Sequence, residues 1–414
     1  MKIAIVGAGI SGLTVAHLLH ERHEITLFEA AGYAGGHTNT VRVDTADETH
    51  HIDTGFIVFN DRNYPNFERL LRGADVRWQP SEMSFGVSDA HGSFEYSSAS
   101  AAGLFATRRH LVTPWFHRMV ADVRRFQRAA RALLADGDAD VSLREWLERE
   151  RFSRPFVERM IVPQVSAVWS ADPQQLWSFP ARFLAEFFDR HGMLGLRDRP
   201  RWRVVAGGSA RYVEKLTAPF ADRIRLRTPV RAITRSGDDV LVRVPGAEPL
   251  RFDHVVLATH SDQALALLAD ATAPEREILG AIRYQPNEAV LHTDARLLPQ
   301  RRRAWASWNY HLLDEPPARA TVTYHMNRLQ SLRSQREYCV TLNLSERIDP
   351  ASVIRRIEYA HPVFTPASLA AQARVNEISG QRRTHFCGAY WRWGFHEDGV
   401  ASGIRVATDL GGDL

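Results

Sequence analysis

The chain has 414 residues, of which 44% are hydrophobic and 24% are charged, and its formal net charge is +4. This composition is globular, and the length exceeds what one hydrophobic core usually supports, so two domains are expected. The two cysteines, Cys339 and Cys387, show no metal-ligand or disulfide spacing, and with only two lysines, Lys2 and Lys215, Schiff-base chemistry is disfavoured because it needs a buried lysine.

The chain begins "MKIAIVGAGI", an apolar run that glycines interrupt at once, unlike a secretory signal peptide. No stretch approaches the roughly 18 to 20 continuous apolar residues that span a bilayer. The expected location is the cytoplasm, with peripheral attachment to the inner face of the membrane as the alternative. Neither a metal nor a nucleic-acid partner is expected.

Residues 2–30 predict a dinucleotide-binding unit. A short strand, "KIAIV", is followed by Gly7, Gly9 and Gly12 in GxGxxG spacing, then by a helical segment and a second strand that ends at Glu29. Gly7 permits a tight turn, Gly9 lets the backbone approach a pyrophosphate, and Gly12 allows close packing of helix and strand. Glu29 lies 17 residues after Gly12, where an acid binds ribose hydroxyls.

A second glycine turn follows the acid. Gly35, Gly36 and His37 would let the chain wrap the pyrophosphate and ribityl of a longer ligand than NAD. Asp53 and Gly55 then open an apolar run, 56–59, that is suited to lie against a flat ring. This order favours FAD.

Residues 114–134, "PWFHRMVADVRRFQRAARALL", predict an amphipathic helix with its apolar face on one side and arginines on the other. Burial of the apolar face with solvated arginines is the favoured interpretation. The alternative is a helix on a membrane surface, with Trp115 and Phe116 at the interface. The apolar positions are Trp115, Met119, Val123, Phe126 and Ala130, and the basic positions are Arg118, Arg125 and Arg128.

Further along, "VLVRV" (240–244) and "HVVLAT" (254–259) are short and β-branched and predict strands. The histidines at positions 17, 20 and 23 fall in the first predicted helix, where packing or surface roles are expected in place of metal binding. The chain contains neither HExxH nor GxSxG, so zinc-protease and nucleophile-elbow chemistry is not indicated.

Several stretches together resemble a known family. "VGAGISGL", "FEA", "AGGHT" and "IDTGFIVF", with "WRVVAGGSARYV" and the C-terminal "CGAYWRWGFHEDGVASG", are similar to the FAD-binding oxidoreductases that include amine oxidases, protoporphyrinogen oxidases and phytoene desaturases. More narrowly, "VWSADPQQLWSFPA" and "TYHMNRLQSL" resemble a bacterial subgroup described as predicted NAD/FAD-binding proteins, whose genes often lie beside cyclopropane fatty acid synthase homologues. The second resemblance suggests lipid chemistry by association alone.

The resemblance implies an α/β fold, with a discontinuous Rossmann-like FAD-binding domain into which an α+β substrate domain of mixed sheet and helices is inserted. The FAD domain would comprise 1–62, 202–262 and 380–414, and the substrate domain 63–201 and 263–379. The last segment would return to the flavin, with a helix from about Ala401 aimed at its ring. The implied FAD contacts are Gly7, Ala8, Gly9, Ile10, Ser11, Gly12, Glu29, Ala30, Gly35, Gly36, His37, Thr38, Gly55, Phe56, Val230, Ala258, Thr259, Gly388, Ala389, Gly399, Val400 and Gly403.

The leading hypothesis is an FAD-dependent oxidoreductase that moves hydride from an apolar substrate to flavin N5, as a desaturase of fatty-acyl chains. The catalytic candidates are Tyr310, His325 and Tyr390, which place aromatic and imidazole groups in the expected cavity wall. The alternatives are a flavin amine oxidase, for which aromatics at 390–393 would flank the amine, and a non-redox flavoprotein or isomerase. The electron acceptor stays open among oxygen, a quinone and a protein.

A membrane surface is a candidate partner, because an acyl phospholipid cannot reach a buried flavin through water: each methylene carried out of a bilayer costs about 0.8 kcal/mol. The expected phosphate contacts are Arg108, Arg109, Arg118 and Arg125, and the expected apolar anchors are Leu111, Trp115 and Phe116.

Overall fold

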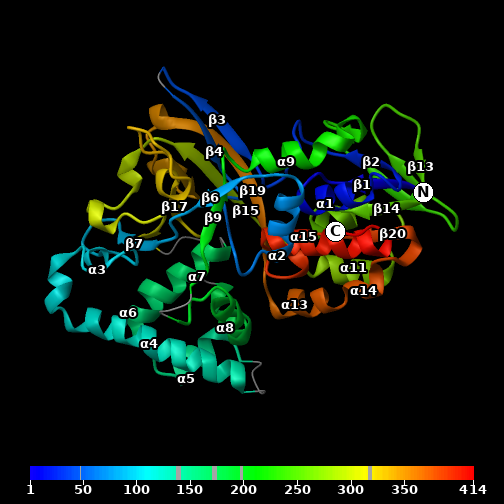
Figure 1. The fold of residues 1–414 in the computed structure, drawn as a ribbon. Coiled ribbons are helices and arrows are strands. Elements are labelled where there is room, and N and C mark those ends of the chain that lie inside the picture. Colours follow the sequence, from blue (N-terminus) through cyan, green and yellow to red (C-terminus); the bar gives the residue numbers. More distant parts are fainter. Residues whose placement is uncertain (47, 137–140, 170–174, 196–198, 316–318) are drawn as a thin grey trace.

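The computed structural model describes the chain except for residues 47, 137–140, 170–174, 196–198 and 316–318. Figure 1 shows two lobes, with both chain termini in the same lobe. The lobe that holds the termini contains a sheet of five parallel strands in the order β10-β2-β1-β14-β20. These strands are Ile224–Arg225, Glu24–Phe28, Lys2–Val6, His254–Leu257 and Thr384–Phe386.

This parallel sheet gathers three distant parts of the chain, as a discontinuous domain requires. β1 pairs with β2 in the register Ile3 to Ile25, and on its other side with β14 in the register Ile5 to Val256. All four of these residues are buried, as expected for a sheet covered on both faces. The predicted α/β fold class is confirmed.

Helices cover the parallel sheet, and α1 (Ile10–Leu19) packs along α15 (His396–Asp409). An antiparallel sheet of β11, β12 and β13 (Ala232–Arg235, Val240–Arg243 and Leu250–Phe252) stands beside it. The remaining helices of this region are α2 (Pro65–Gly73), α9 (Ala210–Thr217), α10 (Ser261–Leu267), α11 (Ala273–Gly280), α13 (Pro366–Ala373) and α14 (Val375–Ile378).

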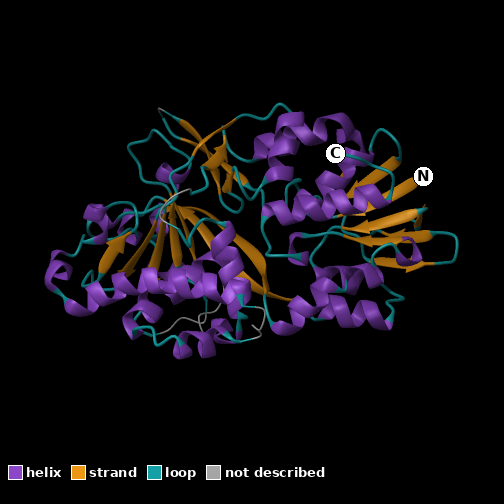
Figure 2. Cartoon of the chain, turned by 60° about the horizontal axis from the view of Figure 1, so that its bottom comes forward, coloured by secondary structure: helices purple, strands orange, loops and turns teal. Residues whose placement is uncertain are grey.

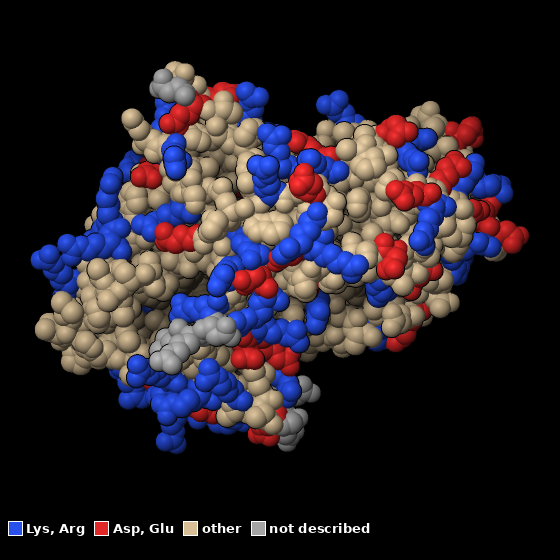
Figure 3. Space-filling view, viewed as in Figure 1, with Lys and Arg blue, Asp and Glu red and all other residues tan. Residues whose placement is uncertain are grey.

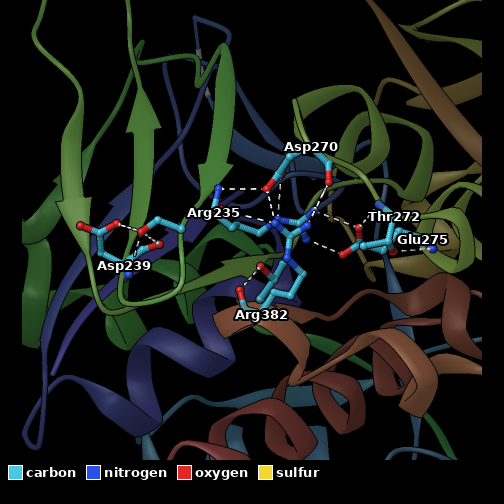
Figure 4. Close-up of polar contacts among 8 residues, drawn as sticks. Arg235, Asp239, Asp270, Thr272, Glu275 and Arg382 are labelled. Atoms are coloured by element: carbon cyan, nitrogen blue, oxygen red, sulfur yellow. Dashed lines mark hydrogen bonds and ion pairs between the residues drawn. The ribbon is translucent and has the colours of Figure 1, made fainter.

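A buried ion-pair network ties β11 to the turn before α11. The Arg235 guanidinium donates to Asp270 from Nε at 2.9 Å and to Glu275 Oε2 from a terminal nitrogen at 2.9 Å (Figure 4). Arg382 reaches the same Asp270 carboxylate at 2.7 Å. The side chains of Arg235 and Glu275 are almost fully buried, so each charge depends on the other for compensation.

The other lobe is built on a mixed sheet of seven strands in the order β19-β15-β18-β17-β16-β7-β8, in which only β16 and β7 pair in parallel. Figure 2 shows helices lying across one side of this sheet. The strands are Val353–Val363, Arg283–His292, Cys339–Leu342, Val322–His325, Trp308–Leu312, Phe85–Asp89 and Glu95–Ser97. The helices of this lobe are α3 (Ala101–Leu104), α4 (Pro114–Ala135), α5 (Leu143–Arg149), α6 (Arg154–Phe156), α7 (Val162–Trp169), α8 (Ala181–Arg190) and α12 (Met326–Leu329).

Two small sheets connect the lobes. β3 pairs with β4 (Thr40–Asp44 and Thr49–Asp53), and β9 (Trp202–Val205) lies between β5 (Val58–Asn60) and β6 (Trp78–Pro80). Asp53, at the end of β4, is buried and accepts from the Ser209 amide at 2.8 Å and from Gln330 Nε2 at 3.1 Å. Burial raises the pKa of this carboxyl to about 7.

The predicted amphipathic helix is α4, and the structure decides how its faces are used. Phe116, Met119 and Phe126 are buried in the core of the lobe with the seven-stranded sheet. Arg118 and Arg125 both pair with the buried Asp122, at 3.4 and 2.5 Å. The expectation that Phe116 is a membrane anchor is therefore wrong, because its side chain has no exposed surface. Among the described helices, none has the length and apolar character needed to cross a membrane.

Candidate active site

The predicted glycine turn closes β1 onto α1 by close backbone contacts. Gly7 has φ +104°, and a Cβ there would lie 2.8 Å from the Ala258 carbonyl oxygen. A Cβ on Gly12 would lie 2.0 Å from the Gly7 oxygen. At Gly9, by contrast, a Cβ would have no protein atom within 4 Å, and the residue lines a large cavity. The turn therefore presents open backbone where a ligand can approach.

Glu29 follows β2 at the rim of the same turn. Its two carboxylate oxygens accept from the amides of Ala8 and Ala31, each at 2.8 Å. These bonds fix the carboxylate at the cavity wall, next to Ala30, and leave further lone pairs for hydroxyl donors. This is the arrangement that ribose recognition needs.

The second glycine turn packs directly on the first. The Gly35 amide donates to the Ala8 oxygen at 2.7 Å, and Gly36, with φ +60°, lies against Gly9. His37 lines the cavity, and its Nε2 atom is buried without a hydrogen-bond partner among the described residues. An orphaned buried imidazole nitrogen beside an open glycine backbone fits a polar ligand group.

Before the C-terminal helix, the residues predicted to bind FAD divide into two sets. Most line one cavity with Glu29, whereas Ala8, Gly12 and Thr38 support its wall from behind. Ala8 donates to Glu29, Gly12 packs on Gly7, and Thr38 Oγ1 bonds the Tyr212 hydroxyl at 2.5 Å. The cavity-lining set is Gly7, Gly9, Ile10, Ser11, Glu29, Ala30, Gly35, Gly36, His37, Gly55, Phe56, Val230, Ala258, Thr259, Gly388 and Ala389.

The C-terminal segment differs from its prediction. Helix α15 begins at His396 and not near Ala401, and its first residue, together with Trp393 and Phe395, lines the cavity. The structure does not bring Gly399, Val400 and Gly403 there. These three residues are buried, and a Cβ on Gly403 would lie 2.8 Å from the Ser11 oxygen, so Gly403 packs α15 on α1. A cofactor contact for the three residues stays a prediction.

Only one of the three predicted catalytic residues lies in the cavity wall. Tyr390 lines the cavity, but Tyr310 and His325 do not. His325 lies on the opposite face of β17 from the cavity and bonds Glu337 at 2.7 Å, and Tyr310 is buried in the core. Because side chains alternate along a strand, Tyr324, next to His325, reaches the cavity in its place. Tyr310 lies two residues beyond Trp308 on the same face of β16, and there it packs into the core.

Tyr324 and Trp308 form an aromatic pair in the cavity wall. They are cross-strand partners in β17 and β16, their ring centroids are 5.0 Å apart, and both line the cavity. The period-two pattern of each strand could have placed them on a common face. Which lobe that face meets depends on contacts with distant parts of the chain.

The cavity has a volume of about 1930 Å³, above the roughly 300–1,000 Å³ of an ordinary small-molecule pocket. One end is formed by the two glycine turns at residues 7–12 and 35–36, which we call the glycine cradle. Much of the rest is apolar, with aliphatic, thioether and aromatic side chains from the seven-stranded lobe. They include Met83, Phe85, Leu104, Val120, Val123, Met160, Val168, Trp169, Phe187, Trp308, Tyr324, Leu342 and Phe364.

Three neighbouring histidines line the cavity beside the second glycine turn. The ring centroid of His37 is 6.0 Å from that of His260 and 5.3 Å from that of His361. Burial, followed by the neighbouring imidazoles, lowers the pKa of His37 and His260 to about 4 and that of His361 to about 3. All three side chains are therefore neutral at pH 7. Sequence reasoning missed His260 and His361, which no local motif marks.

Residues 10–301 match the family described as flavin containing amine oxidoreductase. The match covers well over half of the chain. The chain belongs to this family. Its glycine cradle, open at Gly9 and bordered by Glu29 and the orphaned His37 nitrogen, fits FAD, which is the cofactor of this chain.

Three family comparisons differ in the chemistry that their names state. Amine oxidase [flavin-containing] A of Sus scrofa is 22% identical over 282 residues, which are 62% of this chain and 49% of that protein. Zeta-carotene desaturase of Zea mays is 38% identical over 78 residues, 18% of this chain and 13% of that protein. These curated relatives are thus matched over half of their length or less.

The crystal structure of a CLA-producing fatty acid isomerase from P. acnes superposes with a TM-score of 0.70 at 16% identity. The superposition covers 99% of this chain and 98% of that chain. At this identity the similarity shows a shared fold across the family and leaves the reaction open.

Proposed function

We propose that this protein is an FAD-dependent oxidoreductase that removes hydride from a fatty-acyl chain and leaves a carbon-carbon double bond. Bound FAD supplies a two-electron acceptor for hydride. The protein's own contribution is to hold the chain, exclude water and receive the proton that the neighbouring carbon loses. The electrons finally pass to oxygen, a quinone or a partner protein.

The observation that carries this proposal is the character of the cavity wall. Among the described lining residues, Glu29 is the only acid, and it borders the glycine cradle. The apolar region beyond has no carboxylate to pair with a charged substrate, and it offers surface for methylenes, each of which gains about 0.8 kcal/mol on leaving water. An acyl chain matches this wall.

Arginines line the open side of the cavity. Arg124, Arg199 and Arg201 are exposed and border it, and Arg203 is held there by Glu68 at 2.8 Å. A positive rim repels an alkylammonium ion and attracts a carboxylate or phosphate head group. The rim thus favours an amphipathic acid or phospholipid over an amine.

A neutral histidine suits the proton transfer. Removal of hydride from one carbon and a proton from its neighbour lets the electron pair of the second C–H bond form the new double bond. His260 lines the cavity with an unprotonated ring at pH 7, and the lone pair of its unprotonated nitrogen can accept this proton. His361 already accepts from the Asn287 side-chain amide through Nδ1 at 2.9 Å.

Two other reactions have specific support. The family includes amine oxidases, and Trp393 and Phe395 could flank a neutral amine. The fold is shared with a fatty acid isomerase, which suggests a reaction that moves a double bond without net oxidation. Both reactions would use the same cofactor as the proposed one, and they differ from it in the product.

A matched pair of ligands separates these functions. Flavin-loaded protein is mixed without oxygen with a fatty acid or with the primary amine of the same chain length, and flavin absorbance is followed. The proposal predicts bleaching by the acid and none by the amine. Bleaching by the amine alone would establish an amine oxidase, and bleaching by neither would favour the non-redox function.

A further inference from the structure

Five arginines from two distant segments surround a surface depression on the lobe with the seven-stranded sheet. One segment is η1 (Arg108–Val112), and the other includes η6 (Arg302–Ala304). The depression has a volume of about 570 Å³. We call it the arginine pocket, and its lining is Arg108, Arg109, Arg301, Arg302 and Arg303 with Ser93, Ala106 and Thr107.

The positive charge of the arginine pocket is only partly compensated. Glu95 is buried beneath it and accepts from the Arg301 side chain at 2.9 Å and from the backbone amides of Gln300 and Arg301. Within the part of the chain that the structure describes, neither Arg108 nor Arg303 has a carboxylate within ion-pair distance. Forked guanidinium donors in this number suit a phosphate oxygen cluster.

An apolar tip adjoins the arginine pocket in the same turn. Leu111 is 56% exposed and Val112 is 83% exposed, so both side chains extend into solvent beside Arg108 and Arg109. Few large apolar side chains are exposed elsewhere in the described chain, and none of the others is next to a second. Figure 3 shows basic side chains next to an uncharged protruding surface at this end of the molecule, on the left.

The tip is joined in sequence to two helices of the cavity wall. It lies between α3 and α4, and both helices contribute to the cavity wall through Ala101, Leu104, Val120 and Val123. A lipid held at the tip is therefore close in the structure to the elements that enclose the apolar region. Figure 1 places these elements at the end of the molecule away from the chain termini.

We propose that η1 and the arginine pocket dock this protein on an anionic membrane. A lipid phosphate occupies the pocket, and Leu111 and Val112 enter the acyl layer. The proposal rests on the proposed function in one respect, that the docked membrane supplies the acyl substrate. It keeps Arg108, Arg109 and Leu111 of the docking face expected from sequence and omits Arg118, Arg125 and Phe116, since Arg118 and Arg125 pair with Asp122 and Phe116 is buried.

The test is flotation of flavin-loaded protein with phosphatidylcholine vesicles that contain phosphatidylglycerol, at low and high salt. Binding is expected at low salt and is expected to weaken with salt. Arg108→Gln with Arg303→Gln removes two charges whose side chains make no ion pair, and should weaken binding about 25-fold, since each arginine near an anionic surface contributes roughly fivefold. Leu111→Asn with Val112→Asn should weaken it at least about tenfold.

The matched control is Arg243→Gln with Arg276→Gln, two exposed arginines on the opposite lobe, and it should bind like the wild type. Absence of binding at low salt, equal binding by the Arg108/Arg303 variant, or equal binding to pure phosphatidylcholine would overturn the proposal. Stabilisation by inorganic phosphate without vesicle binding would overturn it too, and would assign the pocket to a soluble anion.

Failure of docking is distinguishable from failure of the proposed function. Bleaching by a detergent-dispersed fatty acid reports on the reaction without a membrane. If bleaching persists and vesicle binding is absent, the docking proposal alone is wrong. If vesicle binding depends on the two arginines and no acyl compound bleaches the flavin, the proposed function alone is wrong.

Discussion

The open space over Gly9 is where a single residue most directly controls the cofactor. Gly9 has φ −75° and ψ 178°, a conformation that any residue adopts, and a Cβ there meets no protein atom within 4 Å. A larger side chain at this position therefore fits the folded protein but projects into the cavity. Its effect would fall on the ligand.

We expect Gly9→Val to yield folded but colourless protein, because the valine side chain occupies the space that the pyrophosphate needs. Flavin content and circular dichroism check this. The control is Gly237→Val, which also has no atom within 4 Å of the added Cβ and lies in the turn between β11 and β12. A yellow Gly9→Val protein with full flavin content would contradict the assignment of the cradle.

The buried imidazoles predict a pH dependence of stability. The ordinary histidine pKa of 6.5 falls to about 4 for His37 and His260 and to about 3 for His361. The unfolded chain thus binds these protons at higher pH than the folded chain. Their contribution to stability is complete above pH 6.5 and is lost as the pH falls toward 3.

Asp53 and Asp398, whose carboxyl pKa burial raises to about 7, act in the opposite direction, so a variant must isolate the histidines. In His361→Asn, the free energy of unfolding should fall less steeply between pH 6.5 and 4, by up to about 1.4 kcal/mol per pH unit. Denaturant titrations across this range measure the slope. Identical slopes in wild type and variant would show that His361 is protonated in the folded protein.

At the scale of elements, the contact between α1 and α15 sets the position of the C-terminal segment at the cavity. Gly403→Ala would place a Cβ 2.8 Å from the Ser11 oxygen and 2.9 Å from Thr14 Cβ. Overpacking of this kind costs about 1–3 kcal/mol, so the melting temperature should fall. Gly73→Ala, near the end of α2 with open space around the added Cβ, should leave it unchanged or raised.

The outcome of Gly403→Ala also decides between two roles. A packing role predicts a lower melting temperature with flavin retained in the protein that remains folded. An unchanged melting temperature with loss of flavin would support the cofactor contact expected from sequence.

Elements that depend on local sequence were predictable, and elements that depend on distant contacts were not. The strand, glycine turn and helix at 2–19 follow from close backbone contacts that only glycine allows, and α4 follows from its apolar periodicity. The start of α15 was misplaced by about five residues because Gly394 and the aromatics before it gave no clear helix signal. The choice of Tyr324 over His325 required knowledge of which face of β17 meets the cavity.

At the scale of the whole molecule, the cavity and the arginine pocket are both assembled from remote segments. Arg108 and Arg303 are almost two hundred positions apart in the sequence, yet they line one depression. The cavity likewise combines the cradle of the parallel-sheet lobe with the apolar wall of the seven-stranded lobe. The proposed reaction depends on this combination, since neither lobe alone holds both a flavin and an acyl chain.

The most direct test of the proposed reaction is the mass of the acyl chain after one turnover. Flavin-loaded protein is incubated without oxygen with a detergent-dispersed fatty acid of defined length, and the acyl chains are then analysed by mass spectrometry. The proposed reaction yields one chain with two hydrogens fewer for each flavin bleached. A chain of unchanged mass, whether intact or with its double bond moved, would contradict it.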